Sequence, residues 1–225
     1  MGEAISEFLD NYGNLLLNGI GETLVMTAVA TVVACLIGVP IGIALIMTAP
    51  NGLRPNKWVN TILGWIVNIG RSIPFIILLV TLIPFTRFIV GTSLGVKGAI
   101  VPLIIAAAPF VGRLAEQSLA EVDSGLVEAA QSFGASDWQI IFKVFLRECL
   151  PSLIRGASIT FITLFGYAAM AGMVGAGGLG DIAIRYGYQR HQDDVMYAAL
   201  ILCIVLVQIV QSFGDWAARK IDHRK

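Results

Sequence analysis

The chain has 225 residues, of which 56% are hydrophobic and only 13% are charged, and its 15 Lys and Arg balance its 15 Asp and Glu. A soluble domain has about half apolar and a quarter charged residues, so this composition argues against an ordinary soluble protein. The zero net charge gives no case for binding nucleic acid. Long apolar runs instead predict an all-α polytopic membrane protein.

Five apolar segments predict membrane-spanning helices, each of which needs ~20 residues. Residues 4–17, before the first span, are expected to form a short helix on the outer surface or to be disordered. The third span is the shortest, and we expect Pro102 and Pro109 to bend it. No internal repeat or linker interrupts the chain, which favours one domain over 1–225. The predicted spans are 23–47, 62–84, 98–111 with an extension toward Glu116, 153–174 and 195–216.

Small residues in the first span allow a second helix to approach closely. Gly38 and Gly42 are separated by three residues, the spacing typical of tightly packed membrane helices. Five helices make a small bundle, so a homodimer is expected and this face is one candidate for the contact. Packing within one subunit is the equally weighted alternative.

The second span contains Arg71, the only charged residue in the interior of a predicted span, since Arg155 and Asp215 lie within two residues of a span end. One interpretation is that Arg71 extends to the cytoplasmic lipid head groups. The other is that it lines a translocation path or braces the cytoplasmic loops. No acidic residue lies in the interior of a span, which argues against proton or sodium coupling.

The segment between the third and fourth spans, about 117–152, is longer than a simple connection needs. Ser136 and Gln139 have the spacing of a capping box, and Gly134 precedes them at a turn where a positive φ is expected. We therefore predict two short helices that bind another protein, as in a permease whose energy is supplied by a separate protein. An apolar stripe is predicted at Trp138, Ile141, Phe142 and Phe145.

A glycine-rich stretch, 165–180, ends the fourth span. Its small residues accompany Tyr167, Met170 and Met173, and flexible Met side chains suit a narrow gate. Tight packing followed by a glycine-rich turn is the alternative, and both can hold.

The distribution of Lys and Arg predicts the orientation. With the N-terminus outside and the C-terminus in the cytoplasm, most basic residues fall on the cytoplasmic side. The predicted inner set is Arg54, Lys57, Arg113, Lys143, Arg147, Arg155, Arg219, Lys220, Arg224 and Lys225, and the outer set is Arg87, Lys97, Arg185 and Arg190.

No catalytic or metal site is indicated. The chain lacks a glycine-rich phosphate loop, so it is not expected to bind ATP by that route. Three cysteines show no metal-ligand spacing, and His191 and His223 lie in polar segments without suitable partners.

Several motifs resemble a known family. Glu128-Ala129-Ala130, Gly134 and Leu150-Pro151 resemble the EAA loop of binding-protein-dependent ABC importer permeases. Further blocks resemble the permease subunits of methionine importers, so that the likeness extends over roughly 20–220. These blocks are 22–27, 71–80, 83–87, 89–93, 174–180 and 186–188.

This resemblance implies a type I ABC importer permease fold and a permease homodimer in the cytoplasmic (inner) membrane lipid. Two separate ATPase subunits would bind ATP and Mg, and this chain would bind no cofactor. A periplasmic or lipid-anchored binding protein would deliver L- and D-methionine. The loop would be the coupling helix, with Trp138 and Ile141 filling a cleft of the ATPase and Glu128 pairing with a basic group, capping the loop or remaining solvated. The implied coupling residues are Glu128, Ala129, Ala130, Gly134, Ala135, Ser136, Trp138, Gln139 and Ile141.

Two departures from the family pattern and three alternatives remain. Leu146-Arg147 stands where the family often has Leu-Pro, and the outer stretch 189–194 is unusually polar. Within the same class, the alternative is an importer for another small amino acid. From other classes, a secondary transporter or channel would show inverted repeats and intramembrane acids, and a structural scaffold would not need the patterned loop.

Overall fold

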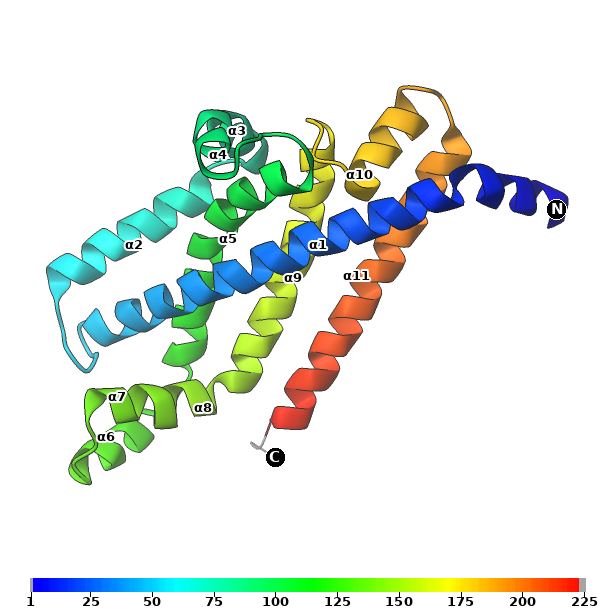
Figure 1. Cartoon of the computed structure of the whole chain (residues 1–225). Coiled ribbons are helices and arrows are strands. Elements are labelled where there is room, and N and C mark those ends of the chain that lie inside the picture. The colour runs from blue at the N-terminus through cyan, green and yellow to red at the C-terminus, as the bar shows by residue number, and fades with distance from the viewer. Residues whose placement is uncertain (1, 223–225) are drawn as a thin grey trace. The chain divides into compact units, whose positions relative to one another are not determined.

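The computed structural model describes residues 2–222, with side chains from Ser6 onward; His223, Arg224 and Lys225, named above, lie outside this range. Within it the chain is all-α, as predicted, and contains no strand. The helices, shown in Figure 1, are α1 (Gly2–Thr48), α2 (Lys57–Ser72), α3 (Phe75–Thr81), α4 (Ile83–Val90), α5 (Gly95–Ala120), α6 (Ser124–Ser132), α7 (Asp137–Ile140), the π-helix η1 (Ile141–Phe145), α8 (Leu146–Glu148), α9 (Leu150–Gly172), α10 (Gly178–Ile182), the π-helix η2 (Ala183–Tyr188) and α11 (Asp193–Ile221).

Four of the described helices, α1, α5, α9 and α11, are long and apolar enough to span a membrane. The predicted continuous second span is wrong, because α2 and α3 are bent by 99° at the break between them. Pro74 explains the break. A residue before proline is disfavoured in the α region, and Ile73 is extended with φ −81° and ψ 122°. Counted as one bent span, α2 and α3 bring the total to five.

Two other predicted boundaries differ from the structure. The N-terminal stretch 4–17 is neither a separate surface helix nor disordered, because α1 is one helix of 47 residues that continues into the first span. The predicted short third span is a helix of 26 residues that runs through both Pro102 and Pro109. Apolar runs therefore located the spans, whereas polar residues flanking them concealed how far each helix extends.

The chain forms two compact units. Unit 1 contains α1 up to Thr31 together with Pro74–Ile104 and Phe161–Val210. Unit 2 contains the rest of α1, the segment to Ile73, Ile105–Thr160 and the chain from Gln211. A buried cluster in unit 1 joins α1, α9, α10 and α11, and it consists of Leu16, Phe165, Leu179, Ile182, Val195 and Ala199.

Close packing of α1 against α5 organises unit 2. A Cβ atom at Gly38 would lie 2.6 Å from Val111 Cβ, and one at Gly42 would lie 2.6 Å from Ala115 Cβ and 2.8 Å from the Glu116 amide nitrogen. Real Cβ atoms do not approach this closely, so only glycine fits at both positions. The small-residue face of the first span thus packs against α5 of the same chain. This packing favours the interpretation of contact within one subunit over that of a homodimer contact.

A substitution at Gly42 tests this packing. Gly42→Ala should lower the thermal midpoint of the purified protein, because the added methyl group forces α1 from α5 and such overpacking costs about 1–3 kcal/mol. Gly21→Ala is the matched control in the same helix, where nothing lies within 4 Å of the added Cβ. We expect the control to be neutral or stabilising, since Ala favours helix over Gly by about 1 kcal/mol. Equal midpoints for the two variants would contradict the role given to Gly42.

Candidate functional site

The loop between α5 and α9 begins with a helix that is closed at both ends. The Asp123 side chain accepts a hydrogen bond from the Gly125 amide (2.7 Å) at the start of α6. At the other end the Gly134 amide donates to Gln131 O (2.9 Å) and the Ala135 amide donates to Ala130 O (3.0 Å). This bond pair is a Schellman motif, which requires a left-handed residue, and Gly134 has φ +75°. The positive φ predicted at Gly134 is confirmed.

The following helix, α7, starts with the predicted capping box. Ser136 Oγ accepts from the Gln139 amide (3.4 Å), and Gln139 Oε1 accepts from the Ser136 amide (2.8 Å). The two bonds satisfy N–H groups that would otherwise be unpaired at the helix start. Figure 1 shows α6 and α7 side by side, joined by this tight turn. Ala130 and Ala135 pack beneath the turn, while Ala129 is exposed.

The inner side of the loop has an apolar core of its own. Ile140, Phe145 and Cys149 are buried together with Leu119 from the end of α5. Ile141 is also buried, with 3% of its surface exposed, whereas the sequence reading placed it in a partner's cleft. The predicted single stripe is therefore divided. The π-helix η1 begins at Ile141, and Ile141 and Phe145 both lie on its inner side.

The outer side of the loop presents aromatic side chains. Trp138 is 70% exposed and Phe142 is 61% exposed, and their rings stack with centroids 6.0 Å apart. Phe133, at the end of α6, is 92% exposed. Sequence analysis missed Phe133, although an aromatic residue directly before the left-handed Gly134 was a visible signal. We call Phe133, Trp138 and Phe142 the exposed aromatic residues of the loop.

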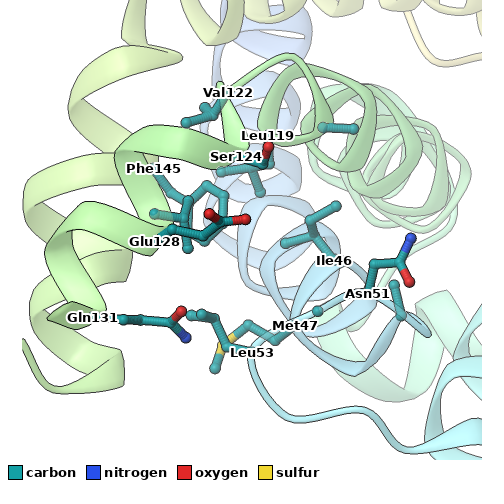
Figure 2. Close-up of a pocket in the computed structure, with 14 residues that line it drawn as sticks. Ile46, Met47, Asn51, Leu53, Leu119, Val122, Ser124, Glu128, Gln131 and Phe145 are labelled. Carbon is teal, nitrogen blue, oxygen red and sulfur yellow. The ribbon is translucent and has the colours of Figure 1, made fainter.

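A cavity of about 320 Å³ lies between this loop and the connection from α1 to α2. Figure 2 shows Glu128 and Gln131 of α6 reaching into it, opposite Met47, Asn51 and Leu53. Glu128 is exposed, and no ion pair of its carboxylate is found within 6–222. The N-cap of α6 is Asp123.

An ion pair fastens the loop to the rest of unit 2. Arg54, in the α1–α2 connection, bonds through Nε to the carboxylate of Asp137, the first residue of α7. Exposed ion pairs contribute only about 0–1 kcal/mol to stability, so its main effect is to fix the position of α7. Nothing in the sequence indicated this pair, because its members are 83 residues apart.

The proposed gate residues lie in unit 1. The Tyr167 ring stacks on Phe75 of α3, with centroids 4.6 Å apart and an interplanar angle of 2°. Met170 lies one turn further along α9 and Met173 follows the helix end, and both are exposed. Arg71 belongs to unit 2, where it is exposed at the end of α2. Tyr167 and Met170 therefore lie on one helix of unit 1, whereas Arg71 lies in unit 2.

The glycine-rich stretch is a tightly packed turn. The Gly175 amide donates to Gly172 O and the Ala176 amide to Ala171 O, a second Schellman motif. Glu22 of α1 then accepts from the Gly178 amide (2.6 Å), and Thr23 Oγ1 accepts from the Leu179 amide (2.9 Å). Two α1 side chains therefore cap α10. The sequence signalled the glycines but not these capping partners.

One carboxyl group beside this turn has a perturbed pKa. Burial raises the pKa of Asp181 above its ordinary value, the nearby Arg185 guanidinium opposes this shift, and Glu22 adds to it. Arg185 also bonds directly to Asp181 (2.6 Å). No group of three His, Cys, Asp or Glu side chains that would hold a metal ion is found among the described residues.

Comparison with known proteins places these features in a family. A family model described as "Binding-protein-dependent transport system inner membrane component" matches residues 38–224. A probable D-methionine transport system permease protein of Vibrio cholerae is 50% identical over 220 residues, covering 98% of each chain. A methionine import system permease protein of Bacillus subtilis is 46% identical, covering 80% of this chain and 81% of its own.

Solved structures give the same result. A chain described under "Inward facing conformations of the MetNI methionine ABC transporter" has a TM-score of 0.93 and 48% identity, covering 95% of this chain and 99% of its own. A chain from the crystal structure of an amino acid ABC transporter has a TM-score of 0.72 at 17% identity, covering 96% of this chain and 97% of its own, which shows a shared fold.

A substitution at Gly134 tests the turn. Gly134→Ala should speed amide hydrogen exchange in 134–140 by about 5–30-fold, because a side chain in the left-handed region costs roughly 1–2 kcal/mol. No atom lies within 4 Å of the added Cβ, so this strain is the only direct effect. Gly134→Asn is the control, since Asn tolerates this conformation and should change exchange much less. Indistinguishable exchange in the Ala variant and the unmodified chain would contradict the assigned turn.

Proposed function

The chain belongs to the family of binding-protein-dependent transport system inner membrane components, and on this premise we propose that it is the permease subunit of an ATP-driven importer of methionine. The support is an identity of 50% over nearly the whole chain to a relative named for D-methionine transport, and the close match to a chain of a methionine ABC transporter. The whole chain acts as one permease domain. The observation that carries the mechanism is the capped loop with the exposed, stacked rings of Trp138 and Phe142.

Energy comes from separate subunits in this proposal. The chain has no glycine-rich phosphate loop, so two partner ATPase subunits bind ATP and Mg and carry out hydrolysis. The permease itself is not an enzyme and binds no cofactor. It pairs with a second copy of itself, and a periplasmic or lipid-anchored binding protein delivers the substrate. Another small amino acid remains the alternative substrate.

The loop transmits motion between the ATPase and the spanning helices. Large exposed aromatic side chains are the usual anchors of protein interfaces, and the rings of Trp138 and Phe142 stack on each other at the loop surface. The Schellman turn at Gly134 and the capping box of Ser136 and Gln139 fix their direction. The exposed small side chain of Ala129 permits close approach, and Glu128 offers its carboxylate to a basic group of the ATPase. Ile141 supports this surface from beneath.

Orientation follows from the basic residues. The N-terminus lies outside and the C-terminus in the cytoplasm, because ten Lys and Arg of the sequence fall on the inner side and four on the outer side in this arrangement. The loop 117–152 is then cytoplasmic, where the ATPase subunits reside. The polar outer stretch 189–194 faces the binding protein.

Loss of the Trp138 ring tests the coupling role. Trp138→Ala should reduce co-purification of the ATPase and lower methionine uptake by the reconstituted complex, since removing an interface anchor of this kind costs about 2–4 kcal/mol. Phe88→Ala is the matched control, because Phe88 of α4 is an aromatic residue outside the loop that is at least as exposed, at 88% against 70% for Trp138. Wild-type uptake with full ATPase occupancy in the Trp138 variant would overturn the coupling role. Transport of another amino acid but not methionine by the unmodified complex would favour the alternative substrate.

A bulky substitution at Met170 tests the gate, which Met170 and Met173 form and Tyr167 borders. Met170→Trp should abolish uptake while the complex still assembles, because a large rigid ring at an exposed position of α9 blocks a narrow path without disturbing the core. Met26→Trp is the contrasting variant, since Met26 is fully buried and its replacement should impair folding instead. Normal uptake by an assembled Met170→Trp complex would move the gate elsewhere.

A further inference from the structure

Helix α2 has three distinct faces, and one of them packs inside unit 2. Val67 is buried there, and the Asn60 side-chain amide donates to Leu45 O (2.8 Å) of α1. A Cβ at Gly70 would lie 2.6 Å from Pro109 Cγ of α5. These contacts fix how α2 is rotated about its own axis, and therefore which side chains face outward.

The second face of α2 is apolar and exposed, as suits contact with lipid. Its residues recur at helical spacing on one side of the helix. Aromatic Trp residues are also typical of membrane helices near the interface. This face consists of Trp58, Ile62, Trp65, Ile66 and Ile69.

The third face is polar and equally exposed. Thr61, Asn68, Arg71 and Ser72, with Gly64 between them, fall within about a third of the helix circumference at 3.6 residues per turn. An Arg facing hydrocarbon costs about 2.5–3.5 kcal/mol or more, so lipid does not suit this face. Extension of Arg71 toward the head groups would explain Arg71 alone and not the other three residues. A second copy of the same face is also unsuitable, because two cationic surfaces would repel.

Two side chains of helix α5 hold Asn68 in position on this face. Arg113 Nη2 donates to Asn68 Oδ1 (2.7 Å), and Arg113 Nη1 donates to Glu116 Oε2 (2.6 Å). Since the Asn68 oxygen is occupied, its amide hydrogens are left as donors. The Glu116 charge is balanced by Arg113, whereas no ion pair of Arg71 is found within 6–222. The face therefore offers donors and one uncompensated positive charge, which suits a carboxylate.

We propose that the polar face of α2 is the wall of a water-filled path and that Arg71, with the Asn68 amide, receives the carboxylate of the amino acid during its passage. This inference rests on the proposed import of an amino acid and names the chemical group that the path recognises. Arg113 and Glu116 are positioning residues, because they act by holding Asn68. The apolar face of α2 meets lipid.

Cysteine accessibility tests the wall. The background is a complex whose Cys35, Cys149 and Cys203 are replaced by Ser, and a charged methanethiosulfonate is added to inside-out vesicles. Single cysteines on the polar face, Thr61→Cys and Ser72→Cys, should react about tenfold faster than Ile62→Cys and Ile69→Cys on the apolar face. The reason is that the ionised thiol, which forms in water, is the reactive form. Ser136→Cys in the exposed loop is the reference for the cytoplasmic side. Equal or reversed rates, or disulfides joining the polar-face cysteines of two copies, would overturn the wall.

Substrate protection tests the carboxylate contact. Millimolar methionine should slow modification of Ser72→Cys, whereas methionine amide, which lacks the carboxylate, should not. Adding Arg71→Gln should abolish the protection and Arg71→Lys should retain part of it, a pattern that a merely structural role would not produce. Protection by the amide, or protection that survives Arg71→Gln, would refute the contact. Equal protection by alanine and methionine would keep the contact and count against methionine selectivity, so the two proposals fail separately.

Discussion

Each helix end leaves backbone N–H or C=O groups without partners inside the helix, and the need to pair these groups decides what holds the helix ends of this protein. Gly134 and Gly175 close α6 and α9 through the same pair of backbone bonds. Where the backbone alone is insufficient, side chains from distant segments supply the bonds, as Glu22 and Thr23 do for α10. The break at Pro74 divides the second span into two helices.

Hydrogen bonds at helix ends also stabilise the loop between α5 and α9. Its helices are too short to be stable alone, since isolated helices below about 12–15 residues are marginal in water. Caps at Asp123 and Ser136, the apolar core around Ile140 and the ion pair of Arg54 with Asp137 stabilise them together. In the proposed coupling role, a loop fixed in this way lowers the entropy cost of ordering Trp138 and Phe142 when the ATPase binds.

Local chemistry was readable in the sequence and long-range geometry was not. The capping box at Ser136 and the left-handed Gly134 follow from residues within a few positions of each other, so both were predicted correctly. The inward position of Ile141 depends on a π-helix. A π-helix has a different number of residues per turn from an α-helix, and the apolar pattern of the sequence did not indicate it. The pairing of Arg54 with Asp137 joins distant segments, and its members look like ordinary surface charges. The Ile73-Pro74 step, by contrast, was a visible signal of the broken span that the apolar run outweighed.

The cap that Glu22 and Thr23 provide for α10 has a consequence for the order in which the protein is made. The bonded residues are separated by 156 positions, so at a synthesis rate of about 5–20 residues per second the start of α10 appears roughly 10–30 s after Glu22. During that interval the Glu22 carboxylate lacks its Gly178 partner. Unit 1 therefore completes its fold late in translation, on a helix that the ribosome released near the beginning.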